Sequence, residues 1–170
     1  MCIRDRFYGI LYLSVMHIMS GMLAGCLIGI CAGILSARFD FLKEWLGIAV
    51  QLMKSLPVAA FIILVLMWWG SKNVTFIISA MVVIPMITTG VKEGIDNTDN
   101  KQIELARVYD MTAFNTFRYV YLTGVYPYIT AQLKVAAGMC FKAGISAEII
   151  GLVTGTIGTQ TVSYTHLTLP

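Results

Sequence analysis

The chain is 170 residues long, and 58% of these residues are hydrophobic while only 12% are charged. Soluble domains are about 45–50% apolar and about 25% charged, so this composition excludes an ordinary soluble domain. The formal net charge of +3 is too small to indicate a nucleic-acid-binding protein. The apolar residues occur in blocks rather than in one-sided stripes, as in helices that face lipid. We therefore predict an all-α fold, a polytopic membrane helix bundle.

The two ends of the chain differ from the rest. Residues 1–6 read MCIRDR and residues 162–170 read VSYTHLTLP, and both resemble translated sequencing-adapter sequence. After Gly158 the apolar pattern stops without a polar loop or a further helix. We therefore expect residues 7–161 to be a fragment of the transmembrane domain and both ends to be non-native, with a genuine short tail as the alternative.

Four stretches are expected to cross the membrane, because a helix needs about 20 residues to span a hydrocarbon core roughly 30 Å thick. The first covers residues 13–36 and contains no charge. The second begins at Pro57, which suits the first turn of a helix, and ends at Trp68 and Trp69, which suit the headgroup region. The third covers about residues 74–89 and the fourth about residues 128–152. Between the first two, the charged and amphipathic residues 38–54 predict an in-plane interfacial helix.

The distribution of positive charge predicts the orientation. One group, between the first and second spans, consists of Arg38, Lys43 and Lys54. A second group, between the third and fourth spans, consists of Lys92, Lys101, Arg107 and Arg118. The tight loop 70–73 makes the second and third spans a hairpin, so both groups lie on one side of the membrane. The positive-inside rule then predicts that this side is the cytoplasm.

The polar segment 92–126 carries a pattern of its own. Residues 102–109 and 112–122 predict two short helices, with a turn at Asp110, because Asp tolerates a left-handed backbone. Phe114, Phe117, Tyr119 and Tyr121 lie on or near the second helix. A helix–turn–helix that exposes aromatic residues outside the bilayer is typical of a docking surface. The alternative is an amphipathic surface helix that rests on lipid.

The residues of this segment resemble the cytoplasmic signature of ABC importer permeases, which reads E-A-A, three residues, G, nine residues, then I-x-L-P. Glu104, Ala106 and Leu122 match it, and Val120 is a conservative replacement. Three positions depart from the signature, namely Leu105 for alanine, Asp110 for glycine and Thr123 for proline. Asp can occupy the turn, and we expect Pro127 to begin the fourth span in place of the missing proline.

Further matches lie outside this segment. Lys54-Ser55-Leu56-Pro57, followed by Trp69-Gly70, is similar to the basic-x-I-P and W-F-G segments of the nitrate/sulfonate/taurine branch. Ala147-Glu148, with Gly151 and Gly158 beyond, resembles the A-E and G-x-G region of that branch. The resemblance covers nearly all of residues 13–160. It identifies the chain as a truncated core of a type I, binding-protein-dependent permease.

The resemblance implies a function and a set of partners. The permease is then a homodimer in the bacterial cytoplasmic membrane, and each copy inserts a short coupling helix into a cytoplasmic ABC ATPase. An extracytoplasmic binding protein delivers the solute, and ATP enters only through the ATPase, because this chain has no P-loop and is expected to bind no cofactor. The coupling residues carried over are Glu104, Leu105, Ala106, Asp110, Val120 and Leu122. The solute classes implied are nitrate, sulfonates, taurine and a thiamine-precursor pyrimidine.

Two further features, a glycine repeat and a pair of charged residues, lie within the predicted spans. Glycine recurs every fourth residue in the first span, which predicts a packing face for a neighbouring helix, at Gly21, Gly25, Gly29 and Gly33. Lys142 and Glu148 lie in the fourth span, where a charge costs at least about 2.5 kcal/mol and should face a cavity or a neighbouring helix. A role in the solute pathway is therefore a hypothesis for these two residues.

Two other functional classes are alternatives to a permease. An intramembrane enzyme needs a nucleophile–base pair or a metal cluster within the spans, and the sequence contains no HExxH, no GxSxG and no paired intramembrane carboxylates. A channel or structural membrane protein remains the alternative. It differs from the permease in that its polar segment 92–126 needs no ATPase partner.

Overall fold

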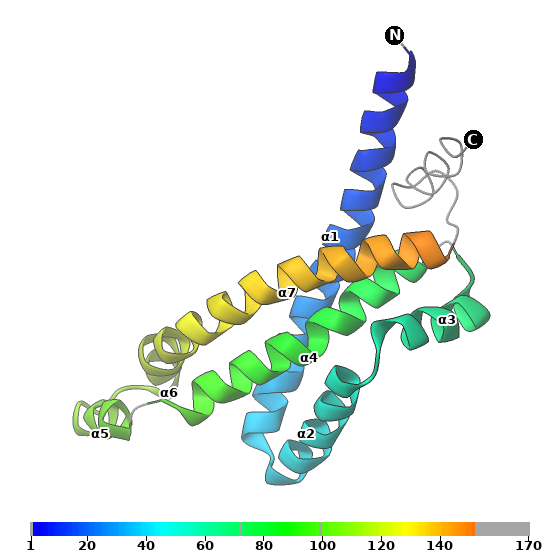
Figure 1. Ribbon diagram of the computed structural model, residues 1–170. Coiled ribbons are helices and arrows are strands. Elements are labelled where there is room, and N and C mark those ends of the chain that lie inside the picture. Colours follow the sequence, from blue (N-terminus) through cyan, green and yellow to red (C-terminus); the bar gives the residue numbers. More distant parts are fainter. Residues whose placement is uncertain (1, 72, 99, 152–170) are drawn as a thin grey trace.

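The computed structural model describes residues 2–71, 73–98 and 100–151, and within these residues every element is a helix and no strand occurs. Figure 1 shows the arrangement. In chain order the elements are α1 (Cys2–Arg38), α2 (Asp40–Ser55), α3 (Val58–Trp69), α4 (Val74–Asp96), α5 (Asn100–Val108), α6 (Ala113–Thr116), the π-helical segment η1 (Phe117–Tyr121) and α7 (Leu122–Ile150). The all-α prediction is confirmed. The C-terminal end predicted to be non-native lies outside the described residues, and the assignment of both ends stays a prediction.

Three long helices form the core of the bundle. The helices α1 and α4 are parallel, because the residue numbers of their contacting pairs increase together, from Gly21 beside Phe76 to Gly33 beside Val91. The helices α4 and α7 are antiparallel, because Gly90 contacts Gln132 and Gly94 contacts Val125. The buried residues at the junction of the three helices are Ile18, Val83, Ile87, Val91, Ala136 and Cys140.

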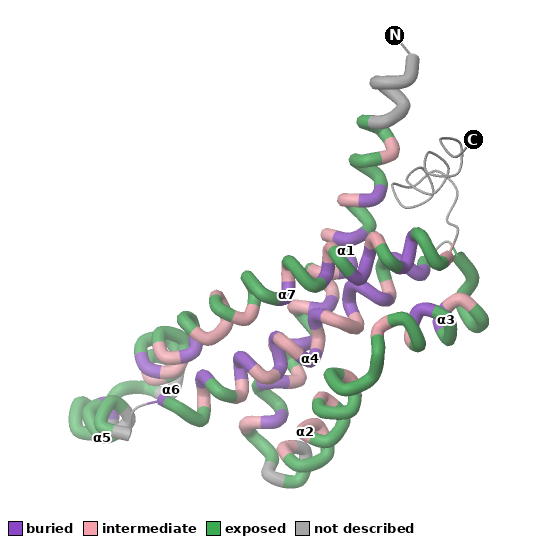
Figure 2. The backbone as a smooth tube through the Cα atoms, viewed as in Figure 1, coloured by how far each residue is buried: buried purple, intermediate pink, exposed green. Residues whose placement is uncertain are grey.

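Burial is concentrated on α4, which lies between the other elements (Figure 2). The N-terminal part of α1 projects beyond the bundle, and its side chains Tyr8, Tyr12 and Leu13 are exposed (Figures 1 and 2). Exposed apolar side chains are also frequent on α3, where Trp68 and Met67 are the most exposed. Such surfaces suit lipid or a neighbouring membrane helix rather than water.

By length and composition, two of the described helices could cross a membrane. These are Tyr8–Arg38 and Val74–Asp96, and they correspond to the first and third predicted spans. The fourth predicted span is a helix of 29 residues, α7, whose length suffices. It is not among the candidates because Lys134, Lys142 and Glu148 interrupt its apolar sequence.

The second predicted span differs from the expectation. Alone, α3 has 12 residues, which is about 18 Å of helix and too short for the hydrocarbon core. Together with Lys43–Ser55 of α2 it is long and apolar enough for a membrane segment that is bent by 99°, which fits a broken span or a re-entrant loop. The break lies at Leu56 and Pro57, because proline has no backbone N–H to continue α2 and instead caps the start of α3.

The helix predicted to lie in the membrane plane corresponds to α2, and one side of it contacts α4. Lys43, near the start of α2, contacts Asp96 at the end of α4, whereas Lys54, near the end of α2, contacts Thr89. The helix α2 thus contacts the last two turns of α4 through these side chains. Its position relative to the membrane stays a prediction.

The start of the fourth span is also corrected. Pro127 lies inside α7 instead of beginning it. The residues from Thr116 to Leu122 keep right-handed helical dihedrals, so α6, η1 and α7 form one continuous helix with a π-helical segment near its start. Proline inside a membrane helix is tolerated where neighbouring groups or local π adjustments compensate for the lost hydrogen bond. The preference of proline for the first turn of a helix therefore does not locate the start of this span.

The two ends of the bundle differ. At one end, Gly70 has φ of 70° and ends α3, so that the chain turns directly into α4, as the predicted hairpin requires. At the other end, α5 and α6 lie beyond the C-terminus of α4 (Figure 1). The segment with the signature thus lies at the end opposite the α3–α4 turn.

Candidate functional site

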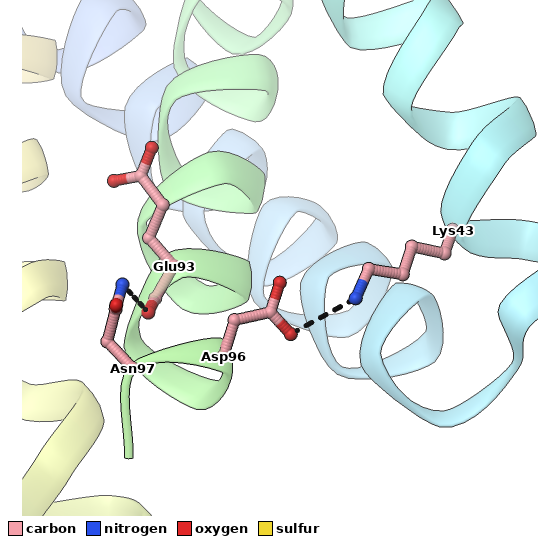
Figure 3. Close-up of polar contacts among 4 residues, drawn as sticks. All are labelled: Lys43, Glu93, Asp96 and Asn97. Atoms are coloured by element: carbon pink, nitrogen blue, oxygen red, sulfur yellow. Dashed lines mark hydrogen bonds and ion pairs between the residues drawn. The ribbon is translucent and has the colours of Figure 1, made fainter. Parts of the chain in front are cut away.

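The candidate site is the pair of short helices between α4 and α7. The predicted helices 102–109 and 112–122 correspond to α5 and to α6 with η1. The helix α4 ends at Asp96, where Asn97 donates a side-chain hydrogen bond of 2.8 Å to the carbonyl oxygen of Glu93 (Figure 3). This bond caps the end of α4, and the chain then enters α5.

A left-handed residue ends α5. Asp110 has φ of 46°, the only positive φ at a non-glycine residue in the described part of the chain. The backbone N–H of Met111 donates a 3.0 Å hydrogen bond to the carbonyl oxygen of Ala106. A left-handed residue followed by a bond that spans five residues is the Schellman motif, which usually has glycine at the left-handed position. Asp110 therefore stands at the glycine position of the signature and also has the left-handed backbone conformation that glycine favours.

The signature residues fall into two groups. Ala106 and Val120 are buried, at 5% and 7% exposure. Glu104, Leu105 and Leu122 are exposed, as is Asp110. The small residue at position 106 therefore fits an interior position, and the signature as a whole does not form one surface patch.

Three apolar side chains are exposed on one face of α5 and at the residue directly after it, and they define what we call the α5 ridge: Leu105, Val108 and Tyr109. Their exposed fractions are 54%, 80% and 74%. Residues spaced by three and four lie on the same face of a helix, so the three side chains are neighbours. Val108 and Tyr109 were not singled out from the sequence, because the signature does not include them. Their apolar character in an otherwise polar segment was the available signal.

The glycine-rich face of α1 lies directly against α4. A Cβ atom added to Gly21 would lie 2.5 Å from the carbonyl oxygen of Phe76, and one on Gly25 would lie 2.8 Å from that of Ala80. At Gly29 and Gly33 the nearest atoms would be the Cβ atoms of Ile87 and Val91, at 2.9 and 2.6 Å. These distances leave no room for any side chain. The helices α1 and α4 consequently approach each other to backbone contact.

The two charged residues predicted in the fourth span do not lie together. Glu148 is fully buried, with 0% exposure, whereas Lys142 is exposed. Gly144, one turn before Glu148, packs against Ile18 and Ser79. One turn before Ile18 on α1 and one turn before Ser79 on α4 lie Ser14 and Thr75, which are also buried. Glu148 thus belongs to a buried polar layer of the three-helix core, and Lys142 faces another direction.

Two cavities border the bent helix pair. One, of about 330 Å³, lies between α2, α3, α4 and α7, and the other, of about 170 Å³, lies between α2 and the last turns of α4. Lys54 lines both of them. The sequence marks Lys54 as one of the positive charges that predict the orientation and as the basic residue before Pro57, whereas its place at the cavities depends on how α2 packs. Over the described residues there is no group of three or more His, Cys, Asp or Glu side chains that could hold a metal ion.

These features define an α-helical membrane protein with closely packed spans and a two-helix segment that projects from one end. The chain matches the family described as binding-protein-dependent transport system inner membrane component over residues 29–166, and it belongs to this family. The resemblance to ABC importer permeases drawn from the signature is confirmed by this match. The members of this family are membrane components of transport systems.

Two curated relatives and one solved structure illustrate the similarity. The chain is 29% identical over 119 residues to the aliphatic sulfonates transport permease protein SsuC of Escherichia coli (strain K12), covering 67% of this chain and 45% of that protein. It is 28% identical over 140 residues to the choline transport system permease protein OpuBD of Bacillus subtilis (strain 168), covering 81% of this chain and 60% of that protein. The chain thus spans about half the length of these relatives. Its fold is similar to that of an amino acid ABC transporter crystallised with histidines, with a TM-score of 0.78, 18% identity and coverage of 97% of this chain and 80% of the other.

Proposed function

We propose that this chain is the permease core of an ATP-driven importer of a small solute in the bacterial cytoplasmic membrane. The observation that supports this most directly is the α5 ridge, because three exposed apolar side chains lie on or directly after a helix that belongs to none of the candidate spans. An exposed apolar ridge outside the membrane is typical of a protein-docking site. In this proposal its occupant is a cytoplasmic ATPase subunit, which binds and hydrolyses the ATP.

The fold offers a route by which movement of the ATPase reaches the spans. The buried Ala106 and its hydrogen bond to Met111 hold α5 against the turn at Asp110. The continuous helix α6–η1–α7 begins three residues after that turn. A displacement of α5 is therefore transmitted to the base of α7 as a rigid-body shift, which is a common way to gate access to a site in the membrane.

The remaining partners follow from the family. An extracytoplasmic binding protein delivers the solute, and a second permease copy completes the pathway. The relatives named for aliphatic sulfonates and for choline support a small organic solute. We propose the nitrate, sulfonate, taurine or thiamine-precursor class. Lys142 and Glu148 are proposed pathway residues, with Lys142 the better placed because it is exposed.

The test is a charge placed in the α5 ridge of the full-length permease. Val108→Asp puts a carboxylate into the apolar contact and should reduce co-purification of the ATPase at least tenfold. Asn115→Asp adds the same charge to an exposed position on α6 and should leave co-purification unchanged. If Val108→Asp retains the ATPase fully, the ridge does not dock it, and the channel or structural alternative is favoured.

A further inference from the structure

The two cavities beside the bent helix pair have complementary linings. The larger one is lined mainly by apolar side chains, of which four are methionines, Met53, Met81, Met86 and Met139. The smaller one is lined by hydroxyl, amide and ammonium groups, namely Ser36, Gln51, Thr88, Thr89, Lys54 and Lys92, together with a few apolar residues. Lys54 contributes to both linings, and its ammonium contacts Thr89 in the lining of the smaller cavity.

The position of Lys54 is held by α4. Its Nζ donates a 2.7 Å hydrogen bond to Oγ1 of Thr89, and that hydroxyl donates a 2.6 Å bond to the carbonyl oxygen of Pro85. Thr89 lies seven residues before Asp96, the last residue of α4, which is about 10 Å along the helix. The ammonium is therefore held about two turns before the end of α4. An ammonium has three donors, and Thr89 accepts one of them.

The charges around these cavities have one sign. Lys54 and Lys92 are the charged residues that line them, and no Asp or Glu does so among the residues the structure describes. The nearby carboxylate of Asp96 instead contacts Lys43, with 3.3 Å between Nζ and Oδ1 (Figure 3). Two lysines without an acid in the same lining favour an anionic ligand.

We propose that the two cavities form one binding site for a small organic anion with a short apolar tail. The oxyanion head contacts Lys54 and the polar lining that includes Lys92, and the tail lies among the methionines. Methionine side chains are flexible and polarisable, so they accommodate tails of different shape. The larger cavity, of about 330 Å³, falls at the small end of the range for ligand sites, roughly 300–1,000 Å³. The break between α2 and α3 adds support, because solute sites in transporters are often built at discontinuous helices.

This proposal rests on the proposed function, since it assigns the anion as the imported solute. The probe is butanesulfonate, and its binding is measured by calorimetry on the full-length permease with its ATPase in phosphatidylcholine nanodiscs. Lys54→Met should weaken binding at least tenfold, and Lys54→Arg should retain it within about threefold. Lys134→Met removes an exposed lysine on α7 that lines neither cavity and should leave binding unchanged.

The outcomes separate the two proposals. If the ATPase fails to co-purify with the unaltered permease, the proposed function is wrong. If the complex assembles but butanesulfonate does not bind, or binds equally well to Lys54→Met, the anion site is wrong while the permease function stands. Choline serves as the cationic probe, and binding of choline equal to that of butanesulfonate also contradicts the site. Displacement of butanesulfonate by phosphatidylglycerol in the nanodisc identifies the occupant as a lipid headgroup and overturns its assignment as a solute.

Discussion

The backbone N–H of Met111 donates its hydrogen bond to the carbonyl oxygen of Ala106 across a turn in which Asp110 has φ of 46°. This bond ends α5 and sets the direction in which the chain enters α6. An L-residue in the left-handed region loses about 1–2 kcal/mol relative to the right-handed one, although Asp and Asn tolerate it better than most. The turn therefore depends on the residue at position 110.

Substitution of Asp110 should change the stability of this turn in a defined order. Asp110→Gly removes the steric penalty and should strengthen the turn, whereas Asp110→Val adds a branched side chain at positive φ and should weaken it by about 1–2 kcal/mol. Asp110→Asn should behave like the parent, because Asn also adopts this conformation. The measurement is hydrogen exchange at the Met111 amide of the full-length permease.

The Asn variant also separates backbone geometry from charge. Equal protection of the Met111 amide in the Gly and Val variants would contradict a turn controlled by the conformational preference of residue 110. A loss of protection in both Gly and Asn variants would show that the carboxylate itself stabilises the turn.

Two glycines in long helices should respond to alanine with opposite sign. A Cβ on Gly25 would lie 2.8 Å from the carbonyl oxygen of Ala80 and 2.9 Å from Cβ of Val83, so Gly25→Ala forces α1 and α4 apart. Overpacking of this kind costs about 1–3 kcal/mol. Gly138, on α7, has nothing within 4 Å of the position of a Cβ, and Gly138→Ala should gain about 0.5–1 kcal/mol from helix propensity. Thermal unfolding of the full-length permease in detergent measures both, and a stabilising Gly25→Ala would rule out the close contact.

Several parts of this arrangement were accessible from the sequence. The alternation of apolar blocks and the signature residues predicted the helical bundle, the hairpin at Gly70 and the two short helices on either side of Asp110. These features depend on local properties: hydropathy, helix-ending residues and the narrow set of residues that accept positive φ. Local preference and tertiary structure agree at these positions.

Other parts depend on tertiary packing and could not be predicted. The sequence indicates that Pro57 breaks a helix, but it does not give the angle between the two halves, which is 99°. The role of Lys54 at the two cavities follows from how α2 packs. The prediction that Pro127 begins the fourth span was wrong, because proline can begin a helix or lie inside one. Which of the two occurs depends on the neighbouring segment. The burial of Ala106 and the exposure of Val108 likewise depend on the position of η1.

The ion pair between Lys43 and Asp96 should contribute little to stability. Its side chains are 41% and 43% exposed, and exposed pairs typically contribute about 0.2–1 kcal/mol. A double-mutant cycle with Lys43→Met and Asp96→Asn, followed by thermal unfolding, should give a coupling energy in that range. A coupling energy of about 3 kcal/mol or more would mean that the pair is buried in the assembled transporter, since breaking buried pairs has costs of that size.

Lys142 and Glu148 should differ in what they affect, because one is exposed and the other fully buried on the same helix. Glu148→Ala leaves a void in the three-helix core and should lower stability by about 2 kcal/mol or more. Lys142→Met removes a charge whose side chain tilts toward the N-terminus of α7, and so toward the interior of the span. Since an exposed lysine at that depth is costly unless it faces water or a partner, Lys142→Met should preserve or raise stability while reducing solute uptake at least tenfold.

The two measurements are made on the same preparations, so that thermal unfolding serves as the control for ATP-driven uptake. Lys134→Met, on the same helix and also exposed, is the matched variant and should alter neither quantity. If Lys142→Met leaves uptake and solute affinity untouched, Lys142 has no role in the pathway and its charge is accommodated elsewhere in the assembly. If instead both Lys142→Met and Glu148→Ala reduce uptake with stability unchanged, Glu148 also acts in transport, and its burial describes only this conformation of the bundle.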